Sequence, residues 1–307
     1  IITFVSSNFN KAIKYKDIWL YLGKQDLNSQ FRRSKLGIAW MIINQLSFSL
    51  GAGLIWAAVF GLNPVEFIPF ISTGFAVWGF IAASYVDSCS VFHMSQGFIK
   101  QVNIPLTTYI FRHTYTSIIR FLIGISVALF ITVISGHMSL IGFLMFIPGL
   151  LMVVILGFFS SYTMAFIGSR YRDVQHGLSN VFQLLFVLTP VIYPPQVLID
   201  KGLGFAVYIN PFTSIIEVVR KPLIEQTLAS TLEYVLVLSY LPLIHISEPT
   251  RHLRTSYAVF CLKKKIYLQD VFFLGPSLLY FSSLYIMSPP LIPSFLFPPH
   301  VSILLCV

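Results

Sequence analysis

The sequence has few charged residues: Asp, Glu, Lys and Arg make up 10% of its 307 residues. A soluble domain of average composition carries about 25%. So few charges cannot cover a surface that faces water. The sequence instead contains several long apolar runs with almost no charge, which is typical of membrane-spanning helices. Because backbone inside a bilayer must satisfy its own hydrogen bonds, these runs predict an all-α, polytopic membrane protein.

The patterns that many enzymes and metal proteins use are missing as well. The sequence has no GxxxxGK[ST] phosphate loop, no HExxH motif and no GxSxG motif. Its three cysteines, Cys89, Cys261 and Cys306, do not have the spacing of a metal site or a disulfide framework. We therefore predict no catalytic residue, no metal site and no cofactor bound by this chain.

The positive charges that are present gather at the ends of the apolar runs. A net charge of +9 could suit nucleic-acid binding, but this distribution favours a membrane surface and no nucleic-acid partner. Residues 1–35 contain seven Lys or Arg, among them Arg32, Arg33 and Lys35, between apolar residues at near-helical spacing. This pattern predicts an amphipathic cytoplasmic helix on the membrane face. A solvated basic arm is the alternative.

Residues 36–240 form the predicted transmembrane domain. Five apolar segments predict spans at 36–60, 67–90, 116–135, 139–167 and 178–196, and a sixth begins near Leu232. The links at 91–115 and 168–177 carry four Lys or Arg, whereas those at 61–66 and 136–138 carry none. The positive-inside rule then places the N-terminus in the cytoplasm of a multi-pass membrane protein.

Residues 189–222 combine moderately apolar stretches with residues that interrupt helices. Pro190, Pro194 and Pro195 break any helix, because proline lacks the backbone donor and clashes with the preceding turn. We predict re-entrant or surface-lying short helices on the outer side, because broken helices at membrane depth must pack in protein or line a wet cavity. A plain outer loop is the alternative.

Residues 241–307 have a different character. The stretches LIHISEPTR (243–251) and SYAVFCLKKK (256–265) resemble the conceptual translation of a sequencing-library adapter. We predict that 241–307 is a non-native tail and that the sixth span ends early. A divergent natural C-terminus is the alternative.

Three acidic or basic residues leave other functions open. Asp87 and Arg120 fall inside or near spans, where charges are costly and often functional. Deep in the membrane and facing a cavity, they would suit a secondary transporter or channel; near the span ends, snorkelling or mutual pairing explains them. Asp173 in RYRDV could serve a membrane-embedded transferase, although an Asp beside two arginines is usually an ion pair.

Four segments, in the same order and spacing, resemble motifs of ABC-2 exporter permeases. They are DLNSQFRRSKLGIAWMIINQL (26–46), GFIKQVNIPL (97–106), SRYRDVQHGLSNVFQLLFVLTPVIYPPQ (169–196) and INPFTSIIEVVR (209–220). The resemblance covers about residues 15–222. Within this family, the four segments resemble those of the branch that exports lipid-linked polysaccharides, meaning O-antigen, capsule or teichoic acid. A drug-exporting permease of the same family is the nearest alternative.

The resemblance implies a six-helix permease fold with an N-terminal interfacial helix and re-entrant helices before the last span. It also implies a homodimer in the bacterial inner membrane, bound to two separate ATPase subunits that hold ATP and Mg²⁺. The substrate would be a lipid-linked glycan.

Two groups of residues follow as candidates for these roles. Those expected to couple to the ATPase are Lys100, Asn103, Pro105, Arg170, Arg172 and Asp173. Those expected to line the channel or its outer gate are Trp40, Trp56, Trp78, Tyr85, Tyr193, Asn210 and Pro211, because aromatic walls can stack on sugar faces without gripping one sugar.

Overall fold

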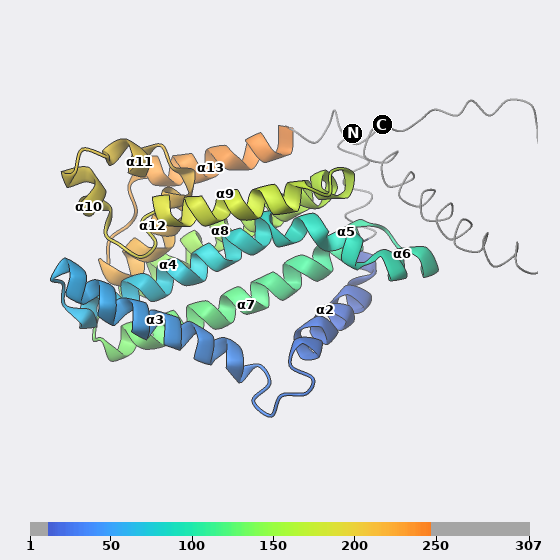
Figure 1. Cartoon of the computed structure of the whole chain (residues 1–307), viewed down its shortest axis with the longest axis horizontal. Coiled ribbons are helices and arrows are strands. Elements are labelled where there is room, and N and C mark those ends of the chain that lie inside the picture. Colours follow the sequence, from blue (N-terminus) through green and yellow to red (C-terminus); the bar gives the residue numbers. More distant parts are fainter. Residues whose placement is uncertain (1–11, 247–307) are drawn as a thin grey trace, which may run out of the picture. The chain divides into compact units, whose positions relative to one another are not determined.

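The computed structural model describes residues 12–246, without the side chains of 206 and 241–246. These residues belong to the first of two compact units, Ile1–Arg251. Within them the chain is helical and contains no strand (Figure 1), as the composition predicts. The helices run in the order α2 (Lys16–Gln30), α3 (Ala39–Phe60), α4 (Pro64–Tyr85), η1 (Asp87–Ser90), α5 (Val91–Met94), α6 (Gln96–Gln101), α7 (Thr107–Ile134), α8 (Leu140–Arg170), α9 (Val174–Leu188), α10 (Pro195–Asp200), α11 (Gly204–Tyr208), α12 (Pro211–Ile224) and α13 (Thr231–Ile246).

Four stretches of helix in the described residues are long and apolar enough to cross a membrane. They are Ala39–Phe60, Pro64–Met94, Thr107–Ile134 and Leu140–Arg170. The first four expected spans are therefore present as helices, although the third begins at Thr107 rather than at 116. The first predicted link, 61–66, is a turn of only 61–63, because α4 begins at Pro64, and the second, 136–138, lies within the turn at 135–139. Asn63 starts α4 by accepting a hydrogen bond from the Val65 N–H at 3.1 Å.

The fifth expected span, 178–196, is wrong in its extent. Helix α9 ends at Leu188 and has 15 residues, fewer than the ~20 that cross a bilayer straight. The reason is Pro190, which has no N–H to continue the helix and disfavours helical backbone at Thr189. Helix α13 begins at Thr231, beside the expected start at Leu232. The predicted non-native tail lies outside the described residues, apart from the backbone of 241–246.

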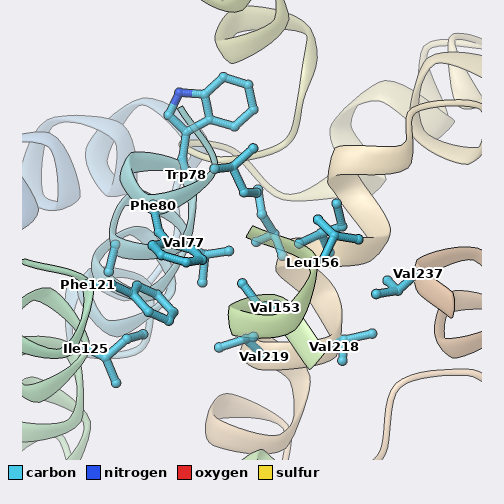
Figure 2. Packing of buried hydrophobic residues seen from close by; sticks show 14 of the residues in the cluster. Val77, Trp78, Phe80, Phe121, Ile125, Val153, Leu156, Val218, Val219 and Val237 are labelled. Carbon is cyan, nitrogen blue, oxygen red and sulfur yellow. The ribbon is translucent and has the colours of Figure 1, made fainter. Parts of the chain in front are cut away.

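Helix α4 lies at the centre of the apolar core. Val77, Phe80 and Ile81 of this helix are at most 3% exposed. The rings of Phe80 and Phe121 of α7 stack at 4.6 Å between centroids. Residues of α8, α12 and α13 complete the same cluster, among them Val153, Leu156, Val218, Val219 and Val237 (Figure 2). Helix α12 is therefore packed into the core and does not form part of a solvated loop.

Glycines on α8 let other segments approach its backbone. A Cβ at Gly142 would lie 2.6 Å from the carbonyl oxygen of Pro222, and one at Gly149 would overlap the Val218 carbonyl, both in α12. Near the other end of α8, a Cβ at Gly168 would overlap the backbone of Cys89 in η1. Small residues at such positions are usual where membrane helices pack closely. The contact at Gly168 places η1, and α5 after it, beside the end of α8 that precedes the 171–173 turn.

Candidate functional site

An open groove of about 490 Å³ lies between α4 and α9. Its lining includes Phe75, Trp78 and Asp87 from α4 and η1, and Ser179, Gln183 and Phe186 from α9. Trp78 is 6% exposed and lies 5.8 Å from Phe182 and 5.6 Å from Phe186 between ring centroids. The groove thus has aromatic walls with a few polar groups between them, a composition common in sites for organic ligands.

The polar side of this groove continues along α9. Five polar residues lie on one face of the helix, because members of two adjacent pairs and a fifth residue recur every four positions. These residues, here called the α9 polar stripe, are Gln175, His176, Ser179, Asn180 and Gln183. All except Gln175 are exposed. Val181 and Leu184 present a separate, apolar exposed face. Because exposed polar groups are costly in hydrocarbon, the stripe must face water or protein.

The predicted channel and gate residues lie in several places. Trp78 lines the groove, and Tyr85 lies 5.4 Å from Phe182 beside it. Trp56 stacks with Phe60 at 5.5 Å in a separate apolar cluster. Trp40 is 41% exposed at the start of α3 and donates to Ser34 Oγ at 3.0 Å. The aromatic residues that the sequence predicts to line one channel are therefore separated in the fold.

Tyr193, Asn210 and Pro211 organise the segment after α9. The Tyr193 hydroxyl donates to the carbonyl oxygens of Val187 at 2.8 Å and Leu188 at 3.0 Å, and burial raises its pKa above the ordinary value. The Asn210 side chain accepts from the Phe212 N–H at 3.0 Å, which caps α12, and donates to Thr189 Oγ1 at 2.7 Å. Pro211 is the first residue of α12, a position where proline is favoured.

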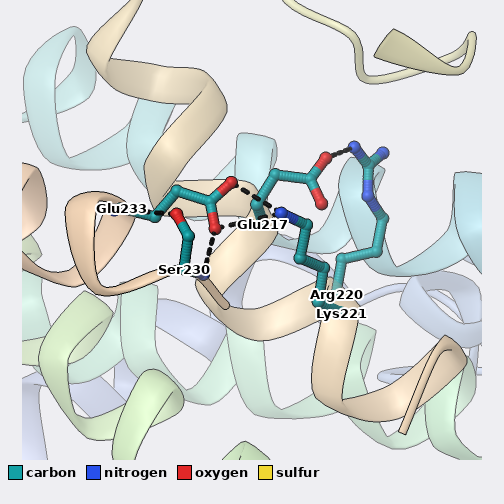
Figure 3. A network of polar contacts seen from close by, with 5 residues as sticks. All are labelled: Glu217, Arg220, Lys221, Ser230 and Glu233. Carbon is teal, nitrogen blue, oxygen red and sulfur yellow. Dashed lines mark hydrogen bonds and ion pairs between the residues drawn. The ribbon is translucent and has the colours of Figure 1, made fainter. Parts of the chain in front are cut away.

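Arg220 and Glu217 form a buried ion pair on α12, which sequence reasoning did not single out (Figure 3). Arg220 is 1% exposed. Its Nη1 donates to the Pro190 carbonyl at 2.9 Å, and its Cζ lies 3.6 Å from the Phe70 ring centroid. Its guanidinium joins α12, α4 and the break after α9.

A second ion pair lies nearer the surface of the same region. Lys221 Nζ contacts the two carboxylate oxygens of Glu233 at 2.7 and 3.0 Å. Glu233 also accepts from the Ser230 N–H at 2.7 Å, while its own N–H donates to Ser230 Oγ at 3.3 Å. This reciprocal cap begins α13 and ties it to α12.

The predicted coupling residues occupy two links at the same end of the spans. Lys100, at the end of α6, and Asn103, in the turn before α7, are exposed, and Pro105 is partly buried. Arg170, Arg172 and Asp173 are exposed around the turn between α8 and α9. Helix α5 packs against α8, so the two links lie at one end. The coupling role of these side chains stays a prediction.

Helix α2 lies against α7 at this same end. Gly23 and Leu27 are buried, and Trp19 contacts Phe111 at 5.5 Å and Tyr115 at 6.0 Å between ring centroids. Arg112 of α7 donates to both carboxylate oxygens of Asp26, at 2.6 Å from Nε. The predicted segment 1–35 thus contains a helix whose buried residues contact the bundle, while its place on a membrane face stays a prediction. Arg32, Arg33 and Lys35 are exposed in the turn after it.

Asp87 and Arg120 interact electrostatically but do not contact each other directly. Asp87 lines the groove, whereas Arg120 Nη2 donates to Gln30 Oε1 of α2 at 3.3 Å. Between residues 12 and 246 no ion pair joins them. In the same part of the chain, no group of three or more His, Cys, Asp or Glu side chains could hold a metal ion.

Comparison with known proteins identifies relatives of the described helices. The RfbA O-antigen export system permease protein of Myxococcus xanthus is 23% identical over 203 residues, which are 66% of this chain and 78% of that protein. A protein of the same name from Klebsiella pneumoniae is 24% identical over 229 residues, 74% of this chain and 87% of that protein. Residues 18–224, from α2 to the end of α12, match the family described as ABC-2 type transporter. The chain therefore belongs to the ABC-2 type transporter family and is a multi-pass membrane protein.

Proposed function

We propose that this chain is the transmembrane subunit of an ATP-driven exporter that moves a lipid-linked polysaccharide across the bacterial cytoplasmic membrane. It would act as a homodimer bound to two ATPase subunits. The names of the relatives, O-antigen export permeases, support the polysaccharide class. The proposed substrates are an O-antigen, a capsule chain or a teichoic acid. The names of the relatives support O-antigen most directly.

The observation that carries this proposal is the groove between α4 and α9 together with the α9 polar stripe. A glycan presents hydroxyl groups that need hydrogen-bond partners and apolar ring faces that stack on aromatic side chains. Trp78, Phe75 and Phe186 supply aromatic surface, and Gln183 and Ser179 supply polar groups, on one lining. A second copy facing the stripe would enclose a polar path between otherwise apolar helices.

The proposed orientation places α2, α6 and the 171–173 turn in the cytoplasm. Lys100 lies in α6, Arg170 ends α8 and Arg172 lies in the turn after it, in keeping with the positive-inside rule. The exposed α6 would then contact the ATPase subunit, which would hold ATP and Mg²⁺. This chain would bind neither and would transmit the closure of its partner to the spans.

The experiment deletes the gene in its source bacterium and complements it with variants while surface glycan is measured. Gln183→Leu and Ser179→Leu remove polar groups from the groove. We expect each to lower surface glycan about tenfold, the effect of losing about 1.4 kcal/mol of hydrogen bonding. Leu184→Met, on the apolar face of the same helix, is the matched control and should export normally.

Two outcomes would contradict the proposal. One is a deletion strain that keeps all its surface polysaccharide and becomes sensitive to hydrophobic drugs, which would favour the drug-export alternative. The other is full glycan export by the groove variants at normal chain abundance, which would place the path elsewhere.

A further inference from the structure

Arg112 touches two segments that lie far apart in the sequence. Its Nε and Nη2 donate to the Asp26 carboxylate of α2, and its Cζ lies 5.4 Å from the ring centroid of Phe98 in α6. The Arg112 side chain is 17% exposed and that of Asp26 is 36% exposed. Two parallel hydrogen bonds from one guanidinium fix both the distance and the angle between the groups.

Ring contacts on both sides of Arg112 hold α2 against α7. The Arg112 Nη1 is buried and has no hydrogen-bond partner within the described part of the chain. On the preceding residue, Phe111, the ring contacts Trp19 of α2 at 5.5 Å, and a Cβ at Gly23 would meet the Tyr115 ring at 2.6 Å. Helix α2 is therefore held on α7 by ring contacts, and the ion pair sets its position relative to Phe98.

We infer that Arg112 is a positioning residue that makes α2 and α6 move as one unit when the ATPase subunits close. The inference rests on the proposed function and adds to it a route for the motion. A displacement of α6 moves the Phe98 ring against the guanidinium, which pulls Asp26 and with it α2. Without the pair, α6 would move while α2 and the basic turn at 31–38 stayed on the membrane.

The test compares Arg112→Gln, Arg112→Lys and the exchanged pair Asp26→Arg/Arg112→Asp, each bound to its ATPase partner. ATP hydrolysis is measured in liposomes and glycan export in cells, both normalised to chain abundance. We expect Arg112→Gln to keep ATP hydrolysis within about twofold of the parent and to lose export about tenfold, because binding at α6 survives but coupling is lost. Arg112→Lys keeps the charge but not the planar fork, so its export should be intermediate.

The exchanged pair separates positioning from simple packing. It re-forms the ion pair with reversed polarity but removes the guanidinium from the Phe98 ring, so it should restore chain abundance while export stays about tenfold low. The matched control is Lys221→Gln, which breaks an ion pair between α12 and α13 at the other end and should leave the ratio of export to hydrolysis unchanged.

The inference is overturned if Arg112→Gln exports at the parental rate, if export falls only in step with abundance, or if the exchanged pair, which lacks the contact with Phe98, exports at the parental rate. A parent chain that supports no glycan export at all would instead overturn the proposed function. ATP hydrolysis by the complex, which needs no glycan, distinguishes the two failures.

Discussion

Arg220 is almost completely buried, although arginine is ordinarily among the most exposed residues. Its charge is balanced by Glu217, by the Pro190 carbonyl and by the face of Phe70. Removing one member of a buried pair leaves the other charge without its partner, which costs about 3–5 kcal/mol, whereas replacing both members can be nearly neutral.

We therefore expect Arg220→Met to destabilise the protein strongly and to lower its apparent Tm in detergent. The double change Glu217→Leu/Arg220→Met should cost less than Arg220→Met alone. Glu233→Gln, in the more exposed pair with Lys221, should lower Tm by much less. Equal melting of Arg220→Met and the parent would show that the buried pair does not stabilise α12.

For single residues, the sequence indicates the motif to which a residue belongs better than it indicates its burial and its partners. The stretch 209–220 was recognised as a motif, and Asn210 does cap a helix. The ion pair was missed, because a charge three residues from an opposite charge is common on exposed helices too. Only the packing of α4 and the break after α9 against α12 shows that Arg220 is buried.

At the scale of single helices, packing depends on small residues at the points where two backbones come close. Helix α8 carries Gly149 directly against the backbone of Val218. We expect Gly149→Ala to lower stability by about 1–3 kcal/mol, because the added methyl group meets a carbonyl that cannot turn away. Thermal melting of the purified chain measures this.

Gly51→Ala in α3 is the control for helix propensity. A Cβ at Gly51 meets nothing within 4 Å, and alanine favours helix over glycine by up to about 1 kcal/mol. Its Tm should stay level or rise. If both alanine variants melt alike, close packing of α8 on α12 does not contribute to stability.

The polar stripe of α9 could have been found from the sequence. Gln175, His176, Ser179, Asn180 and Gln183 recur at helical spacing, but the high apolar content of 178–196 led to a prediction of a uniform span. The mistaken end at 196 has a different origin. The apolar residues continue past Pro190, so hydropathy did not register the break that proline chemistry imposes.

For the molecule as a whole, the arrangement of spans gives a direct test of topology. Single cysteines are placed at Leu62 and Lys201 on one end, and at Asn103 and Arg172 on the other, in a chain whose native cysteines are replaced by serine. All four positions are exposed, so failure to react reports on the membrane and not on burial. A membrane-impermeant thiol reagent should label the first two in intact cells and the last two only after lysis. The reverse pattern would contradict a cytoplasmic N-terminus and, with it, the coupling end.

Fold class and the first four spans could be predicted because both depend on the average hydropathy of long segments. Twenty apolar side chains in a row specify a span almost regardless of their order. The groove depends on which faces of α4 and α9 meet, and that information lies in pairwise packing. Trp78 and Trp56 are alike in sequence context, yet only Trp78 lines the groove.

The turn at Gly61–Asn63 has a consequence for how the protein is made. Three residues reach at most about 10 Å, so the start of α4 cannot move away from the end of α3 during synthesis. We therefore expect the two helices to enter the bilayer together as an antiparallel hairpin, with their turn crossing to the outer side in the proposed orientation. The five residues between α7 and α8 impose nearly the same condition. We expect the insertion machinery to handle two hairpins in succession. The basic residues that remain in the cytoplasm in the proposed orientation would then set the direction of both helices of a pair at once.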